Sequence, residues 1–356
     1  MSPHRLLAGV VLGLQPVLQG QHAATATPVS APIATHSTAD AIQDGVRWLA
    51  AHQDEDGGFS ASLFMRHDPR GDVCTGTGKP DQDFQVTVWA ALAMFGTGNV
   101  DQVGPEHEAA VRVFRWLRAQ KRPDGFLGDP ASNDSVTAHA MCCVALRNGK
   151  RLDDNEPPKE ALQRLVALQL PDGTWPRRPE MLKGDAAATY WAVLACYAEA
   201  AQCGVQVDLH PTLNAIDRGF ASPLQPGAEA GLRLWWGRTP QNDGRLASLA
   251  KGLGKQLPAW PEGAKPADCD FLAWYLESLA IVQSGGEACW RWQGFVRDAL
   301  LPHQRHDGAH AGSWDPIDAR GKEGGRVYST AVNVMTLELG RRDAGILGPG
   351  GNPLGR

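Results

Sequence analysis

Four copies of one short turn constrain this chain more than any other feature of its sequence. Each copy follows an amphipathic segment and runs from a Gln through Asp-Gly to an aromatic residue. The copies are HQDEDGGF (52–59), AQKRPDGF (119–126), LQLPDGTW (168–175) and HQRHDGAHAGSW (303–314). The leading Gln residues are 67, 49 and 135 residues apart, so the last gap has room for at least one degenerate copy. Self-similarity at such periods is typical of repeat proteins, in which each unit buries its apolar face against its neighbours.

The Asp-Gly pair and the aromatic residue have a structural interpretation in all four copies. Asp-Gly supplies a turn with a positive-φ position, and the aromatic ring fills the gap between adjacent helical hairpins. We therefore interpret the copies as joints of the fold.

Two kinds of helical segment alternate between these turns. Amphipathic segments, with apolar residues at helical spacing such as Val111, Phe114 and Leu117, are expected at 41–52, 108–120, 159–169, 213–220, 244–257 and 289–304. Segments that are apolar on nearly every side are expected at 84–96, 135–149, 186–200, 228–237, 270–286 and 327–340. With strand signals nearly absent, this alternation predicts an all-α fold, an (α/α)6 toroid with six outer and six inner helices.

The N-terminal residues have the pattern of a secretory signal peptide. A short basic start, MSPHR, precedes an apolar stretch from Leu6 to Leu18, which is too short for a membrane span, and small residues then offer cleavage after Ala24 or Ala26. We expect a signal peptide at 1–26, a disordered linker at 27–38, the toroid at 39–342 and a Gly/Pro-rich tail at 343–356, with export to the periplasm or medium and no transmembrane span. A net charge of −5 with interspersed signs argues against a nucleic-acid partner, and the oligomeric state stays open.

The turn copies also carry a family resemblance. LQLPDGTW closely matches the QW motif, Gln-x(2–5)-Gly-x-Trp, of the terpenoid cyclase/prenyltransferase superfamily, and the likeness covers roughly residues 40–340. In that superfamily the Gln amide tethers the end of one helix to the next and the ring stacks beneath it; Gln169 and Trp175 match these roles. The segment HAGSWDP, followed by GKEGGRVYSTAVNVMTLEL, is similar to bacterial squalene-cyclase-like or prenyltransferase/squalene-oxidase-repeat proteins. The resemblance implies the toroid fold.

Triterpene cyclases of the protonating class resemble one another in an Asp-x-Asp-Asp-Thr-Ala motif, whose middle Asp must stay protonated near neutral pH. The nearest strings here are DQDF and DCDF, each with two carboxylates and then Phe where the third carboxylate belongs. This resemblance makes Asp83 and Asp270 the candidate catalytic acids, with Asp81 and Asp268 as their companions. Asp134 and Asp185 also precede inner helices. The alternative interpretation is that these acids are helix N-caps.

Protein prenyltransferases resemble one another in a zinc site built from an Asp-x-Cys pair and a His. At the corresponding positions this chain keeps the Cys, as Cys269. The Asp is replaced by Ala267, and the His is replaced by Ser329. No CxxC or Cys/His spacing indicates another structural site. We expect no metal and no other cofactor.

Inner-helix aromatic residues are the remaining candidates for a cavity wall or mouth: Trp89, Tyr190, Trp191, Trp235, Trp236, Trp274, Tyr275 and Tyr328. They would stabilise carbocations in a cyclase, or fill the space between the rings in a plain toroid. The resemblance implies a terpenoid-cyclase-like protein, an isomerase or cyclase acting on an isoprenoid or other apolar lipid. The alternatives are a non-catalytic exported protein that binds a lipid, glycan or protein partner, and an (α/α) barrel acting on polysaccharide.

Overall fold

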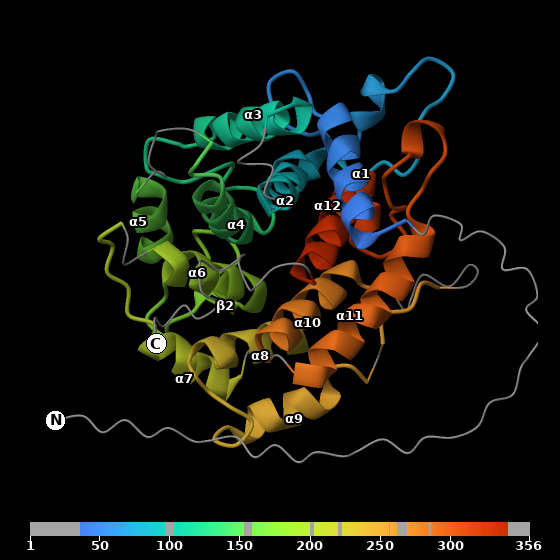
Figure 1. Cartoon of the computed structure of the whole chain (residues 1–356). Helices are drawn as coiled ribbons and strands as arrows, with labels where there is room; N and C mark the ends of the chain where they lie inside the picture. The colour runs from blue at the N-terminus through green and yellow to red at the C-terminus, as the bar shows by residue number, and fades with distance from the viewer. Residues whose placement is uncertain are drawn as a thin grey trace, which may run out of the picture. The chain divides into compact units, whose positions relative to one another are not determined.

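Outer and inner helices alternate along the chain in the computed structural model, which describes residues 36–96, 103–152, 159–199, 203–219, 223–255, 257–261, 269–284 and 286–340 (Figure 1). Within this part of the chain, the outer helices are α1 (Thr38–Ala51), α3 (Pro105–Ala119), α5 (Lys159–Ala167), α7 (His210–Arg218), α9 (Gly244–Gly252) and α11 (Gly286–Leu300). The inner helices are α2 (Asp83–Gly96), α4 (Ser135–Asn148), α6 (Ala186–Glu199), α8 (Pro226–Trp235), α10 (Phe271–Ser284) and α12 (Gly321–Leu339). The predicted all-α (α/α)6 toroid is confirmed.

Several predicted segments fall partly or wholly outside the described residues. These are the signal peptide at 1–26, nearly all of the linker at 27–38, the tail at 343–356, and the residues Ala267 and Asp268. The linker prediction extends slightly too far, because Ser37 is the N-cap of α1 and the helix begins at Thr38; Ser37 and Asp40 form a reciprocal capping box. No helix among the described residues is long and apolar enough to cross a membrane.

The inner helices form one layer and the outer helices cover it. Helix α2 packs between α12 and α4, α4 packs on α6, and α10 packs between α8 and α12. Helices α6 and α8 meet through the stacked rings of Tyr190 and Trp235, whose centroids lie 6.1 Å apart. Almost every residue of α4 is buried, whereas α3 buries one stripe that includes Val113, Phe114 and Leu117. This difference in burial is what the two hydrophobic patterns predict.

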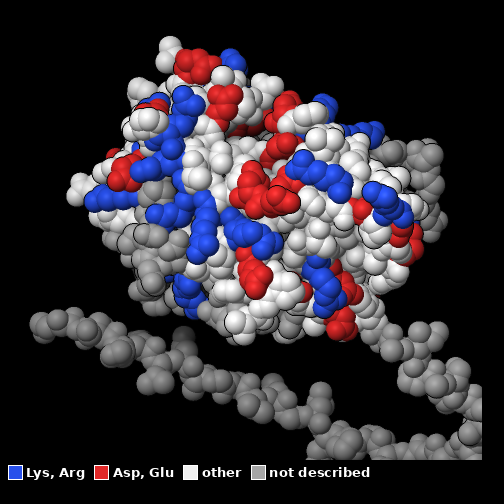
Figure 2. All heavy atoms as spheres, turned by 90° about the horizontal axis from the view of Figure 1, so that it is seen from above, with Lys and Arg blue, Asp and Glu red and all other residues white. Residues whose placement is uncertain are grey.

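Short irregular elements connect the helices. They are the 3-10 turns η1 (Phe64–His67), η2 (Pro80–Gln82), η5 (Leu301–His303) and η6 (Gly308–His310), and the antiparallel strands β1 (Trp175–Pro176) and β2 (Gly184–Asp185). On the face that Figure 2 presents, Lys and Arg side chains lie among Asp and Glu side chains.

Three of the four turn copies bond to the next outer helix through their Gln side chain. The Gln169 Nε2 donates to Gly173 O in its own turn and to Asp208 O just before α7. In the last copy the Gln304 Nε2 donates to Gly312 O and to Ala41 O of α1, both at 2.8 Å. The rings at the ends of the copies, Phe59, Phe126, Trp175 and Trp314, are buried. The last turn therefore attaches to the first helix and closes the ring.

Glycine is required where the backbone of a turn lies in close contact with a neighbouring segment. Gly173 has a φ of +87°, and a Cβ there would lie 2.3 Å from the backbone of Pro211 and Thr212 in α7. Gly325, with a φ of +67°, kinks α12 at the point where it meets Gly78 of the segment before α2. The regular part of α12 therefore begins near residue 327, as the sequence predicts.

The first and last hairpins meet along a seam, which we define as the contacts of α1 and residues 61–79 with residues 304–326 and α12. Along it Lys79 N donates to Glu323 O at 2.6 Å, and Arg326 N donates to Gly76 O at 2.8 Å. The Trp48 Nε1 donates to Ala309 O at 2.9 Å. Backbone and side-chain hydrogen bonds thus both cross the seam.

Candidate functional site

The inner helices hold the turn copies through one recurring hydrogen bond. In four of the six inner helices, α2, α4, α6 and α12, a side chain accepts a backbone N–H from the turn before the helix. The pairs are Thr87 with Phe59 N, His139 with Leu127 N, Thr189 with Trp175 N and Thr330 with Trp314 N. Burial lowers the pKa of His139 to about 3, so this ring is neutral and accepts at Nδ1. This face of these four inner helices therefore holds the turns in place.

Asp83 lies on that structural face of α2. Asp83 and Thr87 are four residues apart and so share one face of the helix. The Asp83 carboxylate accepts Ala61 N at 2.8 Å and the Ser60 hydroxyl at 3.3 Å. Burial raises the pKa of Asp83, while these hydrogen bonds oppose the increase. The side chain holds the turn at residues 59–61.

Asp270 is exposed and caps α10. Its carboxylate accepts Ala273 N at 2.9 Å, as expected of an N-cap. The buried acid next to it is Asp318, which the sequence analysis missed. Asp318 is 1% exposed and accepts Gly321 N and Phe271 N, at the starts of α12 and α10. Burial is the largest cause that raises the pKa of Asp318 to about 6, and the nearby Asp270 charge adds to it.

The other predicted acids have separate positions. Asp185 caps α6 through Ala188 N at 2.9 Å. Asp134 does not cap α4 with its side chain; it has a φ of +57° and forms a two-pronged pair with Arg177 at 2.5 and 3.1 Å. Asp81 is exposed in η2. The described acids therefore do not converge on one point in the centre of the toroid.

Aromatic rings do converge there. Trp89 of α2 makes edge-to-face contacts with Trp191 of α6, Tyr275 of α10 and Tyr328 of α12, at centroid distances of 5.6, 6.3 and 5.8 Å. Tyr190 of α6 joins the group through Trp191. Because four inner helices contribute these buried rings, the rings pack against one another across the centre.

Two of the other aromatic candidates lie outside the group around Trp89. Trp235 joins the group by stacking on Tyr190, whereas Trp236 is the half-buried C-cap of α8. Trp274 is buried but packs on Phe271, at 5.5 Å, instead of on Trp89. Adjacent residues of an all-apolar helix cannot be assigned to a face by composition alone.

An apolar pocket of about 310 Å3 lies between α10, α11, α12 and the start of α1. Its apolar wall includes Val282, Trp292, Val296, Leu337 and Leu339, and polar residues at the same pocket are Ser37, Thr38, Ser278, Gln293, Arg297 and Thr336. This volume lies near the lower end of the range of about 300–1,000 Å3 that is typical of small-molecule sites. We call it the α11 pocket.

Buried polar atoms of α12 lie one turn before the α11 pocket. Ser329 Oγ and both polar atoms of the Asn333 amide are buried and make no hydrogen bond with another described atom. Asn333 shares a helix face with Ser329, four residues before it, and with Thr336 and Leu337 of the pocket wall. A buried polar group without a partner costs about 1–3 kcal/mol, which a ligand hydroxyl or carbonyl could recover.

The chain has the (α/α)6 toroid fold of the type II terpene cyclases. One solved example is MstE from Scytonema; its ligand-free structure is 16% identical over 85% of this chain and 97% of that chain, with a TM-score of 0.51. Two MstE variants, one with the product merosterolic acid A and one with the substrate geranylgeranyl dihydroxybenzoate, are each 14% identical and have TM-scores of 0.52. They cover 84% and 85% of this chain, and 96% of theirs. Identities this low show a likeness of fold alone. No protein-family model matches the chain, and no curated protein matches it.

Proposed function

We propose that this chain is a cyclase-like toroid that binds an isoprenoid alcohol, or another apolar lipid with one polar group, in the α11 pocket without cyclising it. The observation that carries the proposal is the combination of an apolar wall with the unpaired Asn333 amide one helical turn away. An apolar chain would gain from burial at the wall, and a hydroxyl would pair with the amide.

Two features support binding over cyclisation. Asp83 and Asp270, the candidate acids, are occupied by the backbone N–H groups of a turn and of a helix start. A carboxylate that holds a turn or a helix start in this way would have to give up these hydrogen bonds to reach a substrate. In addition, the rings around Trp89 contact one another across the centre of the toroid, where a cyclase of this fold would need space for its substrate. MstE variants bind the substrate geranylgeranyl dihydroxybenzoate and the product merosterolic acid A, which supports isoprenoids as the ligand class to test.

Binding is tested with farnesol and with farnesene, the hydrocarbon of the same chain length, by equilibrium dialysis against the purified chain. We expect saturable binding of both, and tighter binding of farnesol. Val282→Trp adds a large ring to the half-buried pocket wall and should weaken farnesol binding at least tenfold. The matched control is Val103→Trp, because Val103 is 97% exposed and lies outside the pocket. Equal affinity in the two variants, or no saturable binding by the wild type, would reject the α11 pocket.

The hydroxyl preference is tested at Asn333. Asn333→Leu keeps the size of the side chain and removes the amide, so the affinities for farnesol and farnesene should converge. A preference that survives in this variant would show that another group reads the hydroxyl.

Cyclisation is tested separately, by incubating wild type, Asp83→Asn and Asp270→Asn with squalene and shorter polyprenols and resolving the products by mass. We expect unchanged substrate in all three. A cyclic product from the wild type that disappears in one variant would overturn the non-catalytic part of the proposal and leave the binding part standing.

A further inference from the structure

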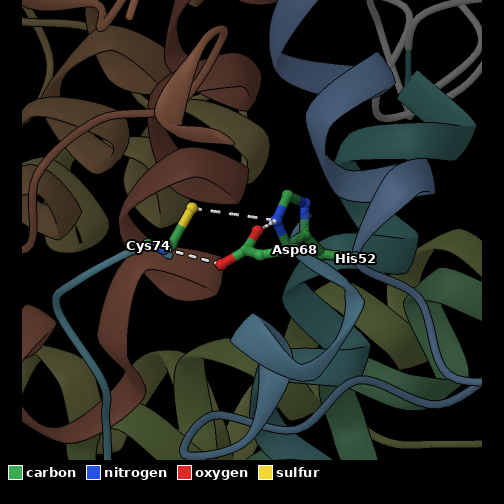
Figure 3. Close-up of side chains that lie close together, drawn as sticks. All are labelled: His52, Asp68 and Cys74. Carbon is green, nitrogen blue, oxygen red and sulfur yellow. Dashed lines mark hydrogen bonds and ion pairs between the residues drawn. The ribbon is translucent and has the colours of Figure 1, made fainter. Parts of the chain in front are cut away.

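Three side chains with metal-binding atoms meet at the seam, away from the α11 pocket. His52 is the C-cap of α1, Asp68 follows η1, and Cys74 lies on the segment leading to α2. One ligand atom from each residue lies within 4.8 Å of the other two (Figure 3). The His52 Nε2 is 2.8 Å from Asp68 Oδ1 and 3.8 Å from Cys74 Sγ.

Hydrogen bonds orient two of the three groups toward a common point. The His52 Nδ1 lies 2.7 Å from Trp48 O, a backbone carbonyl that can only accept, so Nδ1 carries a proton. In a neutral ring this leaves a lone pair on Nε2, which faces Asp68 Oδ1. The other Asp68 oxygen accepts Cys74 N at 2.6 Å, which fixes the carboxylate. Two acceptors that face each other at 2.8 Å need a proton or a metal ion between them. A backbone partner on the second nitrogen is also the usual arrangement around a metal-bound histidine.

We propose that His52, Asp68 and Cys74 bind one Zn2+ ion. Imidazole, carboxylate and thiolate are all zinc ligands. Bond lengths of about 2.0–2.3 Å place tetrahedral ligand atoms roughly 3.3–3.6 Å apart. The His52–Asp68 distance of 2.8 Å would therefore widen by about half an ångström, the His52–Cys74 distance of 3.8 Å would shorten slightly, and the Asp68 oxygen and the Cys74 Sγ already lie within 4.8 Å of each other. A thiolate and a carboxylate also neutralise the two charges of the ion, which suits side chains that are at most 6% exposed.

The site has a route to solvent. His52 and Asp68 form part of the wall of a pocket of about 480 Å3, together with Arg47, Trp48 and His306. An ion can therefore reach His52 and Asp68 from this pocket, and water from it can complete a fourth coordination position.

The position indicates what the ion would do. The Cys74 thiol donates to Ala309 O at 3.1 Å, a bond that it would exchange for the metal bond as a thiolate. Ala309 O also accepts the Trp48 Nε1, and Ala309 N donates to Asp72 at 2.8 Å. The ligands thus come from the first hairpin and pack on the loop before α12. An ion here would join the end of α1 to residues 68–74 and stabilise the seam. This site is separate from the prenyltransferase-like positions Cys269 and Ser329, and it revises the prediction that the chain carries no metal.

The test is a titration of the chelator-treated full chain with Co2+, which reports a thiolate ligand through a near-ultraviolet charge-transfer band. We expect one Co2+ per chain, with this band and the visible bands of tetrahedral cobalt, and displacement by Zn2+. Zinc should also raise the Tm of the wild type. No thiolate band in the wild type would overturn the proposal.

Variants identify the ligands. Cys74→Ala should lose the thiolate band and the zinc-dependent increase in Tm, whereas Cys142→Ala, at an equally buried cysteine in α4, should keep both. Asp68→Asn should bind Co2+ at least tenfold more weakly while keeping the thiolate band. A band that persists in Cys74→Ala would assign the metal to another cysteine. If Cys74→Ala does not fold, the wild-type and Asp68→Asn titrations still decide the question.

Discussion

Replacing Gln304 by Leu should lower the free energy of unfolding by about 2–4 kcal/mol. The Gln304 side chain is 3% exposed, and its Nε2 donates to Ala41 O and Gly312 O, both at 2.8 Å. Leu fills a similar volume but donates no hydrogen bond, so two acceptors in a buried joint each lose a partner. The cost of leaving a buried acceptor unsatisfied is about 1–3 kcal/mol. Two such acceptors would together cost about 2–6 kcal/mol. We expect the lower part of this range, because Ala41 O lies inside α1 and can still accept a hydrogen bond within the helix.

The assay is urea unfolding followed by circular dichroism, with the m-value compared between variants. Gln53→Leu should cost a similar amount, because the Gln53 Nε2 makes the equivalent pair of bonds to Gly57 O and Ala109 O. Gln82→Leu is the control: the Gln82 amide makes a 3.5 Å contact with exposed Asp81, so its change should stay within about 0.5 kcal/mol. If Gln304→Leu and Gln82→Leu unfold at the same urea concentration, the Gln amides do not hold the joints as argued.

Three further predictions address the turns, a buried acid and the N-terminus. Gly173→Ala should cost at least about 2 kcal/mol more than Gly219→Ala in thermal unfolding, because both have φ near +85° but only the first Cβ would meet backbone. Burial raises the folded-state pKa of Asp318 to about 6, above its unfolded value of about 3.9, so its contribution to stability falls as pH rises through that window. Asp318→Asn should remove up to about 3 kcal/mol of the difference in stability between pH 4 and pH 7, and an unchanged pH profile would contradict this. Mass spectrometry of protein from the native host should find residues 1–24 or 1–26 absent, and an intact Met1 would refute export by cleavage.

The helices and joints could be predicted because their signals are local. Asp-Gly in a turn and apolar residues at helical spacing act within one or two turns of the chain. The orientation of Asp83 could not be predicted, since it depends on which face of α2 meets the loop at residues 59–61. His52, Asp68 and Cys74 also lack a recognisable spacing, because a helix end and an irregular segment bring them together. Asp318 was missed because nothing in DPIDAR shows that two helix starts will enclose it.

The seam gives this repeat protein a different kind of cooperativity from an open solenoid. Terminal units of an open array have one neighbour each, so unfolding can start at either end and propagate unit by unit. Here α1 packs on α12, and the last turn copy donates to Ala41 O, so the first and last hairpins each have a neighbour on both sides. Opening any hairpin then requires breaking two interfaces at once. Native-state hydrogen exchange should accordingly show the inner helices opening together, without a gradient of protection from the first hairpin to the last.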